Sequence, residues 1–374
     1  MRILLVCYDS PFNRTYGGAL RTNSIWEALG RVGEVRALVM EPSDHTALDN
    51  TPREGEIGRV HFKRPAVPWA TPEVRKVRRL VRELTASEKF DLVVVRHIRL
   101  AMLIRGSVDA PLVADCDDLD KALPTLDKTI FRRQVDAMKA MAIRAVTRRA
   151  LTRYAHVWFG NPQDMAKFPV ESGSVLHNVV TAPSAVLPRA SSHPPCVLMV
   201  GKFGYEPNAE GVDFFVASVL PGLRAAAPET RFRLVGQCPN HLAARWRLVD
   251  GVEIAGFVDD LAAEYAHASV VVAPIFSGGG TQIKVLEALG YACGTVVSAF
   301  SAVRFEPTLR ANQHLLVASD AAEWVAQCLR LIDSPAQADQ LGLAGRKVVA
   351  QKFSLDAMAQ EVRSTVSRVC GVSQ

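Results

Sequence analysis

Short apolar runs alternate with amphipathic, helix-length segments along almost the whole 374-residue chain. A short apolar run bounded by turn residues is typical of a buried strand, and helical segments between such runs are typical of βαβ units. The first half contains "RILLVC", "DLVVVRH", "APLVADC" and "AHVWFGN", and the second contains "PCVLMVG", "RFRLVG", "VVVAPI" and "GTVVSA". The alternation therefore predicts an α/β fold with parallel, doubly wound sheets.

The alternation of apolar runs and helical segments is interrupted at "TAPSAVLPRASSHPP", which is rich in Pro, Ser and Ala and has no periodicity. We interpret this stretch as a linker, and the chain length also favours two domains. We expect a Rossmann-like N-terminal domain over 1–180, the linker over 181–195, and a second domain over 196–352. A final helix over 353–374 is a candidate to cross back to the N-terminal domain. Ligands of such sheets bind at the carboxyl ends of the strands.

The composition excludes several classes of protein. No apolar run reaches the roughly 18 residues that span a bilayer, and "MRILLVC" is too short for a signal peptide. We therefore expect a cytoplasmic protein, with peripheral contact at the inner membrane face left open. The seven cysteines contain no C-x-x-C pair, which predicts free thiols and no zinc site. No G-x-G-x-x-G follows either opening strand, which argues against a dehydrogenase.

Positive charge is concentrated in the N-terminal half of the chain. Residues 1–190 hold 29 Lys and Arg against 21 Asp and Glu, although the whole chain carries only +6. The excess lies in "VRKVRRLVREL" and "FRRQVDAMKAMAIRAVTRRALTRY". Basic helices of this kind suit an anionic membrane surface or a phosphorylated substrate, and a solvated helix face is the alternative. Nucleic acid is disfavoured as a partner because the runs lack interleaved aromatic residues.

Three consecutive glycines separate the strand "VVVAPI" from the helix "TQIKVLEALGYA". Because ordered glycines cost backbone entropy, the run predicts that a ligand approaches the main chain closely. The free N–H groups of a helix start suit a phosphate, with Thr281 as the N-cap. Lys284 and Glu287 are three residues apart and share a helix face, where they suit a phosphate and a ribose diol. The alternative is a plain turn with a solvated Lys284–Glu287 ion pair.

The stretch "VVVAPIFSGGGTQIKVLEALGYACGTVVS" resembles the donor-binding segment of GT-B glycosyltransferases, in particular family four, the group 1 enzymes of polysaccharide biosynthesis. "VLMVGKFGYEPNAEGVDFF", "RFRLVGQCPN" and "VEIAGFVDD" are similar to other segments of that family in the same order, and "YGGALR" and "VLHNVV" are similar more loosely. The resemblance implies two Rossmann-like domains facing a central cleft. It implies sugar transfer from a nucleoside diphosphate sugar to a hydroxyl, with retention and with no metal or other cofactor, in bacterial polysaccharide or glycolipid assembly.

The resemblance also implies a set of donor-binding residues: Gly17, Gly18, Lys202, Phe257, Val258, Gly278, Gly279, Gly280, Thr281, Lys284 and Glu287. This chain departs from the family at four places, one of which is Glu210, near the position of the usual second cation. Gly279 stands where many relatives carry the first Glu of Glu-x7-Glu, and Lys202 stands where Arg is common. "AFSAVRF" replaces a Gly-rich turn. We therefore expect Lys202 and Lys284 to bind the diphosphate and backbone N–H groups to replace the missing carboxylate.

Polar residues at two strand ends are candidates for acceptor-side chemistry. His97 ends "DLVVVRH", and Asp115 and Asp117 end "PLVADCD". Asp-Cys-Asp matches the D-x-D metal motif of the GT-A architecture, but the resemblance to GT-B enzymes argues against a metal. Asp117 is the nearest match to a polar residue that contacts the sugar or acceptor in relatives. It could accept the proton of the attacking hydroxyl or stabilise an oxocarbenium-like sugar.

We place Asp115 and His97 behind Asp117 in this role, and Arg21 on the acceptor side. The alternatives are an aspartate N-cap for the segment that follows, a structural histidine, and a solvent-exposed arginine. Two other functions remain open: a sugar-nucleotide epimerase on the same fold, and a sugar- or nucleotide-binding protein without catalysis. The acceptor could be a lipid-linked saccharide or a soluble molecule.

Overall fold

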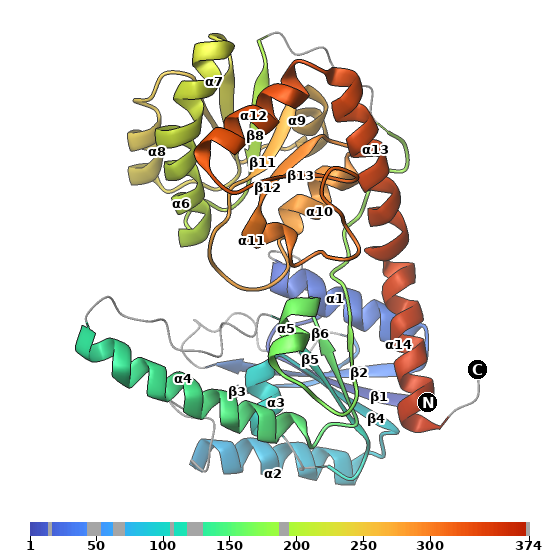
Figure 1. The fold of residues 1–374 in the computed structure, drawn as a ribbon. Helices are drawn as coiled ribbons and strands as arrows, with labels where there is room; N and C mark the ends of the chain where they lie inside the picture. The colour runs from blue at the N-terminus through green and yellow to red at the C-terminus, as the bar shows by residue number, and fades with distance from the viewer. Residues whose placement is uncertain are drawn as a thin grey trace. The chain divides into compact units, whose positions relative to one another are not determined.

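The computed structural model describes residues 1–13, 17–42, 54–62, 72–104, 108–117, 130–186 and 194–371. These residues form two compact units (Figure 1). Unit 1 comprises 1–179, 279–281 and 355–374, and unit 2 comprises 180–278 and 282–354. Each unit contains one sheet in which every strand pairing is parallel. The predicted α/β class with two parallel sheets is confirmed.

The sheet of unit 1 has seven strands in the order β3-β2-β1-β4-β5-β6-β7. The strands are β1 (Arg2–Cys7), β2 (Glu34–Pro42), β3 (Glu56–Phe62), β4 (Leu92–Arg96), β5 (Leu112–Cys116), β6 (His156–Phe159) and β7 (Gly173–Val175). The helices are α1 (Gly17–Gly30), α2 (Pro72–Ser87), α3 (Ile98–Ile104), α4 (Ile130–Leu151), α5 (Pro162–Lys167) and α14 (Leu355–Cys370).

Both faces of this sheet are buried, which explains why its strands are continuous apolar runs. Along β1, Leu4 and Val6 belong to one hydrophobic cluster, and Ile3 and Leu5 belong to the cluster on the opposite face. The first cluster includes residues of α2 and α3, and the second includes residues of α1 and α14. The last helix of the chain, α14, therefore completes the core of unit 1.

The sheet of unit 2 has six strands in the order β10-β9-β8-β11-β12-β13. The strands are β8 (Cys196–Val200), β9 (Arg231–Val235), β10 (Val252–Gly256), β11 (Val270–Ala273), β12 (Thr295–Ser298) and β13 (Leu316–Ala318). The helices are α6 (Glu206–Phe214), η2 (Phe215–Val219, a π-helical turn), α7 (Leu220–Ala226), α8 (Asn240–Trp246), α9 (Leu261–His267), α10 (Ile283–Gly290), α11 (Ala299–Ala302), α12 (Ala321–Ile332) and α13 (Pro335–Lys352).

The segment "PNAEGVDFFVASVLPGLRAAAP", predicted as one helix, is divided into α6, η2 and α7. Pro221 explains the division, because a proline has no N–H for the helical ladder and is tolerated only in the first turn of a helix. It lies in the first turn of α7. Such interruptions do not change which strands the segment connects, β8 and β9.

The strand order reverses at one place in each sheet, between β1 and β4 in unit 1 and between β8 and β11 in unit 2. In doubly wound folds the ligand site lies at the carboxyl ends of the strands beside such a switch point. The predicted site residues Arg21, His97, Lys202 and Lys284 all follow one of these four strands. Among the helices that the structure describes, none is long and apolar enough to cross a bilayer.

Candidate functional site

The glycine loop, Gly278–Gly280, connects β11 to α10. Its backbone takes the left-handed conformation at Gly278, with φ of +95°, and again at Gly280, with φ of +74°. A Cβ atom at Gly278 would lie 2.5 Å from the hydroxyl oxygen of Tyr205 and 3.1 Å from Pro207. A side chain at Gly278 is therefore disfavoured by the backbone conformation, and it would also have to displace the Tyr205 hydroxyl. These close neighbours belong to the protein itself, so the predicted approach of a ligand to this main chain stays a prediction.

The helix α10 begins later than predicted. Thr281 was expected to be the N-cap, but the N-cap is Gln282, and its side chain makes no capping hydrogen bond. The backbone of Gln282 is not helical, with φ of −78° and ψ of 83°, so Thr281 lies one residue too early to cap. The prediction for Thr281 as N-cap is wrong. The first turn of α10 therefore lacks a side-chain cap, and its N–H groups can bind an anion.

Asn208 connects the two predicted diphosphate-binding lysines. Lys284 Nζ donates a hydrogen bond to Asn208 Oδ1, and Asn208 Nδ2 donates to the Lys202 carbonyl at 2.8 Å. Asn208 is only 5% exposed, whereas the Lys202 side chain is exposed. The loop after β8 and the helix after β11 are therefore joined at the switch point. Sequence reasoning missed Asn208, because an asparagine near a helix start has no spacing that indicates this bond.

Burial makes Lys284 and Glu287 easier to neutralise than free side chains. It lowers the pKa of Lys284 to about 8, against the opposing effect of Glu287. Burial also raises the pKa of Glu287, and Lys284 opposes that shift. The predicted ion pair is therefore not a solvated one, because burial dominates at both groups. A lysine in this environment gains strongly from a phosphate that holds its charge.

Phe257 and Val258 follow β10 and differ in exposure. The Phe257 side chain is 84% exposed. Val258 packs against a small cluster that contains the buried Tyr265 of α9. The ring of Tyr265 stacks on Tyr291 at 4.5 Å between centroids. This cluster joins the start of α9 to the face of α10 and brings the β10 loop toward the helix that carries Glu287.

Two arginines enclose one carboxylate at the strand ends of unit 1. Arg21 Nη2 and Nε lie 2.6 Å and 3.0 Å from the two Asp115 oxygens, and Arg96 Nη1 lies 2.7 Å from Oδ2. The side chains of Arg21 and Asp115 have no exposed surface. Arg21 also donates to Asn178 Oδ1 at 2.6 Å. Sequence reasoning missed Arg96, although a charged residue that ends a run of valines was a signal.

These contacts differ from the expected roles of Arg21 and Asp115. Arg21 was expected on the acceptor side, with a solvent-exposed arginine as the alternative, but its guanidinium is buried. Burial opposes ionisation of Asp115, but Arg21 and Arg96 outweigh it and hold the pKa of that carboxyl below its usual range. A low-pKa carboxylate that already accepts bonds from two arginines is a poor proton acceptor. Both residues are better explained as parts of an internal ion-pair network.

Asp117 lies at the edge of this network. Its Oδ2 is 3.9 Å from both Arg21 Nε and Arg96 Nη2. Its Oδ1 is buried and has no hydrogen-bond partner among the described residues. A Cβ atom at Gly160, the residue after β6, would lie 2.7 Å from this oxygen. A buried carboxylate oxygen without a partner is costly, so its free acceptor site suits a donor from a ligand.

His97 has a strained backbone next to this carboxylate pair. Its φ is +93°, a value that is uncommon outside glycine, and residues with such strained backbones cluster at functional sites in proteins. Its N–H donates to the Asp115 carbonyl at 3.3 Å, and its ring lies 5.6 Å from that of Tyr8. Gly18, in the first turn of α1, accepts a bond from Arg96 at 2.7 Å through its carbonyl, and Gly17 precedes it. The structure thus brings these residues into one neighbourhood.

The D-x-D motif has no metal-binding arrangement in the described part of the chain. Asp115 is enclosed by arginines, which repel a cation. No three His, Cys, Asp or Glu side chains gather among the residues that the structure describes. The N-cap alternative for these aspartates falls on the segment after Asp117, and residues 118–129 lie outside the described ranges.

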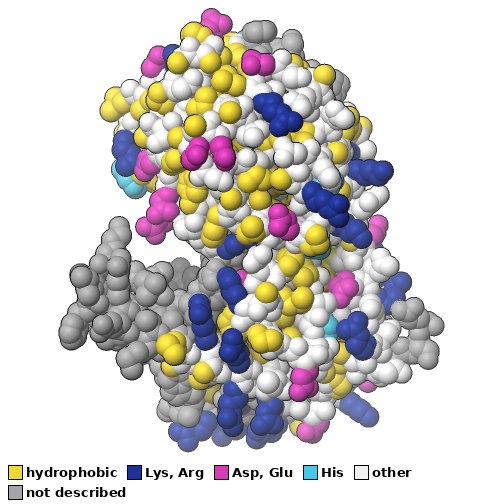
Figure 2. All heavy atoms as spheres, in the orientation of Figure 1, with side chains coloured by type: hydrophobic (Ala, Val, Ile, Leu, Met, Phe, Trp, Pro, Cys, Tyr) yellow, Lys and Arg dark blue, Asp and Glu magenta, His cyan; other side chains and the backbone are white. Residues whose placement is uncertain are grey.

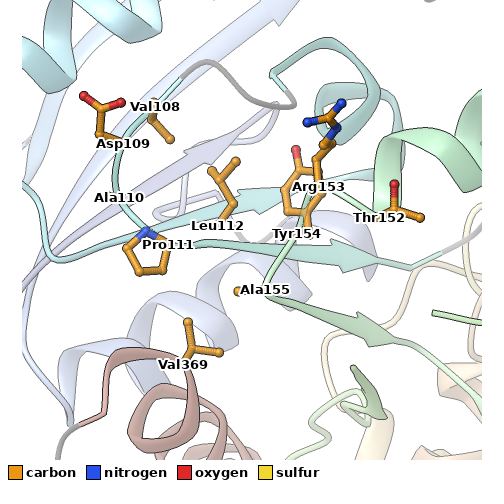
Figure 3. A pocket seen from close by; sticks show the side chains of 10 residues that line it. All are labelled: Val108, Asp109, Ala110, Pro111, Leu112, Thr152, Arg153, Tyr154, Ala155 and Val369. Atoms are coloured by element: carbon orange, nitrogen blue, oxygen red, sulfur yellow. The ribbon is translucent and has the colours of Figure 1, made fainter. Parts of the chain in front are cut away.

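A pocket of about 540 Å³ lies elsewhere in unit 1 (Figure 3). Residues before β5, such as Asp109 and Pro111, line it together with Arg153 and Tyr154 before β6, and Val369 of α14. These positions are the amino ends of the strands. The pocket therefore lies at the opposite edge of the sheet from Asp117 and does not contain any predicted site residue.

Known proteins are similar to this chain in part of its sequence and in its fold. Residues 194–334 match the model of the family "Glycosyl transferases group 1". That range holds the glycine loop, Lys202, Asn208, Lys284 and Glu287. Solved structures with the same fold over the whole chain are GT-B glycosyltransferases. The chain therefore has the GT-B fold, and part of its second half is similar to group 1 glycosyltransferases. No curated protein sequence matches it at a significant level.

Three structures illustrate the similarity of the glycosyltransferase fold. Sucrose-phosphate synthase from Thermosynechococcus elongatus has 16% identity and a TM-score of 0.74, over 100% of both chains. HepE from Anabaena, in complex with UDP, has 15% identity and a TM-score of 0.67, over 98% of this chain and 100% of HepE. The lipopolysaccharide outer core galactosyltransferase WaaB has 12% identity and a TM-score of 0.67, over 98% and 99%.

Proposed function

We propose that this protein is a glycosyltransferase that moves a sugar from a nucleoside diphosphate sugar to a hydroxyl acceptor. The observation that carries the proposal is the arrangement around α10. A half-buried lysine, an uncapped helix start and a loop of glycines converge at the switch point of unit 2. Each of these features favours an anion. HepE, which has the same fold, was solved with UDP, with UDP and glucose, and with UDP-glucose.

In this proposal the residues of unit 2 bind the donor. Lys284, Lys202 and the N–H groups of the glycine loop stabilise the departing diphosphate, where negative charge develops. Glu287 accepts hydrogen bonds from the ribose diol. Phe257 and Val258 lie beside the base. The lowered pKa of Lys284 supports its part, because a lysine poised near neutrality gains most from an added phosphate.

On the acceptor side we assign the chemistry to Asp117. Its Oδ1 is the carboxylate oxygen that lacks a partner, and it accepts the proton of the attacking hydroxyl or faces the positive charge of the sugar. Arg21, Arg96 and Asp115 hold the strand ends in place. His97 keeps its predicted role beside Asp117. We propose that the product retains the anomeric configuration of the donor, as the family resemblance implies.

A thermal-shift screen tests this function directly. Nucleoside diphosphates and their sugars with different bases are added one at a time to the protein. We expect one base to raise the melting temperature clearly, and the corresponding nucleotide sugar to turn over when glycolipid or saccharide acceptors are supplied. If no nucleotide shifts the melting temperature, the donor proposal is wrong. Formation of a new nucleotide sugar without an acceptor would instead indicate an epimerase.

We further propose that the acceptor is presented at an anionic membrane surface, as in the assembly of a bacterial polysaccharide or glycolipid. Figure 2 shows Lys and Arg side chains gathered over α2. The exposed basic residues of α2 and of the last part of α4 are Arg75, Lys76, Arg79, Arg82, Arg144, Arg148 and Arg149. Met141, also on α4, is 71% exposed. The helix α3 packs against both α2 and α4, so the two basic helices are neighbours.

Vesicle flotation tests this contact. Arg75, Arg79 and Arg82 are changed to Glu together, and Arg78 is left intact because its Nε donates to the Leu103 carbonyl at 2.6 Å. At low salt we expect the wild type to float with vesicles that contain phosphatidylglycerol and not with phosphatidylcholine alone, and the variant to stay behind.

The matched control of this experiment makes the same charge change on unit 2, with Arg247, Lys347 and Lys352, all exposed, changed to Glu. Its flotation should equal that of the wild type, because these residues lie outside α2 and α4. Loss of flotation in the control as well would indicate a general charge effect. Absence of wild-type flotation at low salt would refute the membrane proposal.

A further inference from the structure

The segment after β12 contacts the glycine loop from both of its ends. Ser298, the N-cap of α11, donates a hydrogen bond to the Ile275 carbonyl, before the glycines. Ser301 Oγ donates to Gln282 Oε1 at 2.5 Å, after the glycines. This segment is "AFSAVRF", where the sequence departs from the Gly-rich turn that is common in the family. The departure therefore coincides with contacts to the loop.

Arg304, at the end of this segment, contacts the glycines themselves. Its Nη2 donates to the Gly278 carbonyl at 2.8 Å. The guanidinium carbon lies 4.1 Å from the centre of the Phe300 ring, and the residue is only 6% exposed. A guanidinium is planar and always charged, and stacking on an aromatic ring fixes its plane. The direction of this hydrogen bond is therefore set by packing.

A run of three glycines needs such support. Ordering the backbone costs conformational entropy, and glycine loses more conformational freedom than any other residue. On the side of α6, Tyr205 and Pro207 lie against Gly278, and Ser277 Oγ donates to Glu210 at 3.0 Å. Arg304 holds the carbonyl of the same glycine from another element. The loop is thus restrained by two separate parts of unit 2.

The peptide bond between Gly278 and Gly279 transmits this restraint. In a trans peptide the carbonyl and the N–H point in opposite directions, so fixing the Gly278 carbonyl also fixes the Gly279 N–H. A cation on the carbonyl polarises the peptide and makes its N–H a stronger donor. Gly279 is the position where the family resemblance leads us to expect a carboxylate. We expect a backbone donor, the Gly279 N–H, to take that place, with a direction that depends on Arg304.

We propose that Arg304 is a positioning residue that orders the glycine loop for the donor diphosphate. It acts through the Gly278 peptide and does not itself contact the donor. The inference rests on the proposed donor function of unit 2. It explains why this chain carries an arginine in "AFSAVRF". The arginine restrains the loop, which in relatives with a glutamate in place of Gly279 is restrained by that side chain.

The test combines nucleotide affinity with a direct measure of loop order. The variants are Arg304→Gln, Arg304→Lys and the matched control Arg310→Gln, an exposed arginine six residues further on. The probe is the nucleoside diphosphate that the wild type binds best among UDP, GDP and ADP, titrated by calorimetry. We expect Arg304→Gln to weaken binding about tenfold or more, Arg304→Lys to restore part of the affinity, and Arg310→Gln to bind like the wild type.

Hydrogen exchange without nucleotide separates this inference from the proposed function. We expect faster exchange of the amides of residues 278–282 in Arg304→Gln and unchanged exchange in the strands of unit 2. If the wild type binds no nucleotide but the loop still exchanges faster in Arg304→Gln, Arg304 orders the loop and the proposed donor function is wrong. Wild-type affinity and wild-type loop exchange in folded Arg304→Gln would overturn the inference. If Arg304→Gln unfolds, Phe300→Leu replaces it, because this variant removes only the ring on which Arg304 stacks. We expect Phe300→Leu to speed hydrogen exchange in the loop and to weaken nucleotide binding severalfold. No change in either quantity would overturn the inference.

Discussion

The strand ends of the two units hold their charged residues in opposite ways. In unit 1, Arg21 and Arg96 both bind Asp115, and the arginine–carboxylate contacts are closed within the protein. In unit 2, Lys284 is bound by the neutral Asn208 and makes no ion pair with a carboxylate among the described residues. A closed network stabilises the fold. The charge of a lysine that is hydrogen-bonded to a neutral amide is not neutralised by that partner, so the lysine can bind an external anion. Charged residues at strand ends are therefore not all binding residues.

The largest effect should follow from opening the closed network. Asp115→Ala leaves two buried arginines without their carboxylate, and we expect it to lower the free energy of unfolding by about 3–5 kcal/mol. Urea denaturation measures this loss. The control is Asp250→Ala, which breaks a 2.6 Å ion pair with Arg224 at an aspartate side chain that is 91% exposed. We expect that loss to be at most about 1 kcal/mol. Equal effects at Asp115 and Asp250 would contradict the distinction between the two networks.

The next largest effect concerns turnover. Lys284→Ala and Glu287→Ala should each lower kcat by about 10²–10³-fold, which is typical of removing one group that stabilises the developing charge. Their melting temperatures should stay close to that of the wild type, because neither belongs to a closed network. Lys347→Ala, at an exposed lysine of α13, serves as the control. Near-wild-type kcat in both variants would refute the assignment of the donor site to α10.

A smaller effect should appear in the pH dependence of diphosphate binding. Because burial lowers the pKa of Lys284 to about 8, the lysine loses its charge as the pH rises through that value, and affinity should fall on the alkaline side. We expect a loss of up to about tenfold per pH unit above pH 8. The diphosphate itself is fully ionised there. Calorimetric titration from pH 7.5 to 9.5 measures the fall, and Lys284→Arg should flatten it. A flat wild-type profile would contradict the role of this lysine.

The fold and the general position of the site could be predicted from the sequence. Strands buried on both faces are continuous apolar runs. For this reason the sequence alone identifies five of the strands: β1, β4, β5, β8 and β11. The site residues were placed by one further rule, that ligands bind at the carboxyl ends of such strands. The final helix, predicted over 353–374, is also present as α14.

The partners of the site residues could not be predicted. Arg21 was expected to be exposed or to face the acceptor, because arginines are rarely buried unless paired. Its partner Asp115 lies 94 residues further along the chain, and no local pattern predicts that pairing. The start of α10 was misplaced for a similar reason. Ser301, which contacts Gln282 from 19 residues away, fixes the residue before the helix.

The central claim is a division of roles: α10 of unit 2 binds the diphosphate, and Asp117 of unit 1 takes part in chemistry. Calorimetric titration of the nucleoside diphosphate into Lys284→Ala and Asp117→Asn, paired with the kcat of each variant, tests this claim most directly. The account predicts that Lys284→Ala loses diphosphate affinity by at least about tenfold. It predicts that Asp117→Asn keeps wild-type affinity and loses kcat by about 10²-fold or more. Full affinity in Lys284→Ala would contradict it, and so would either full kcat or lost affinity in Asp117→Asn.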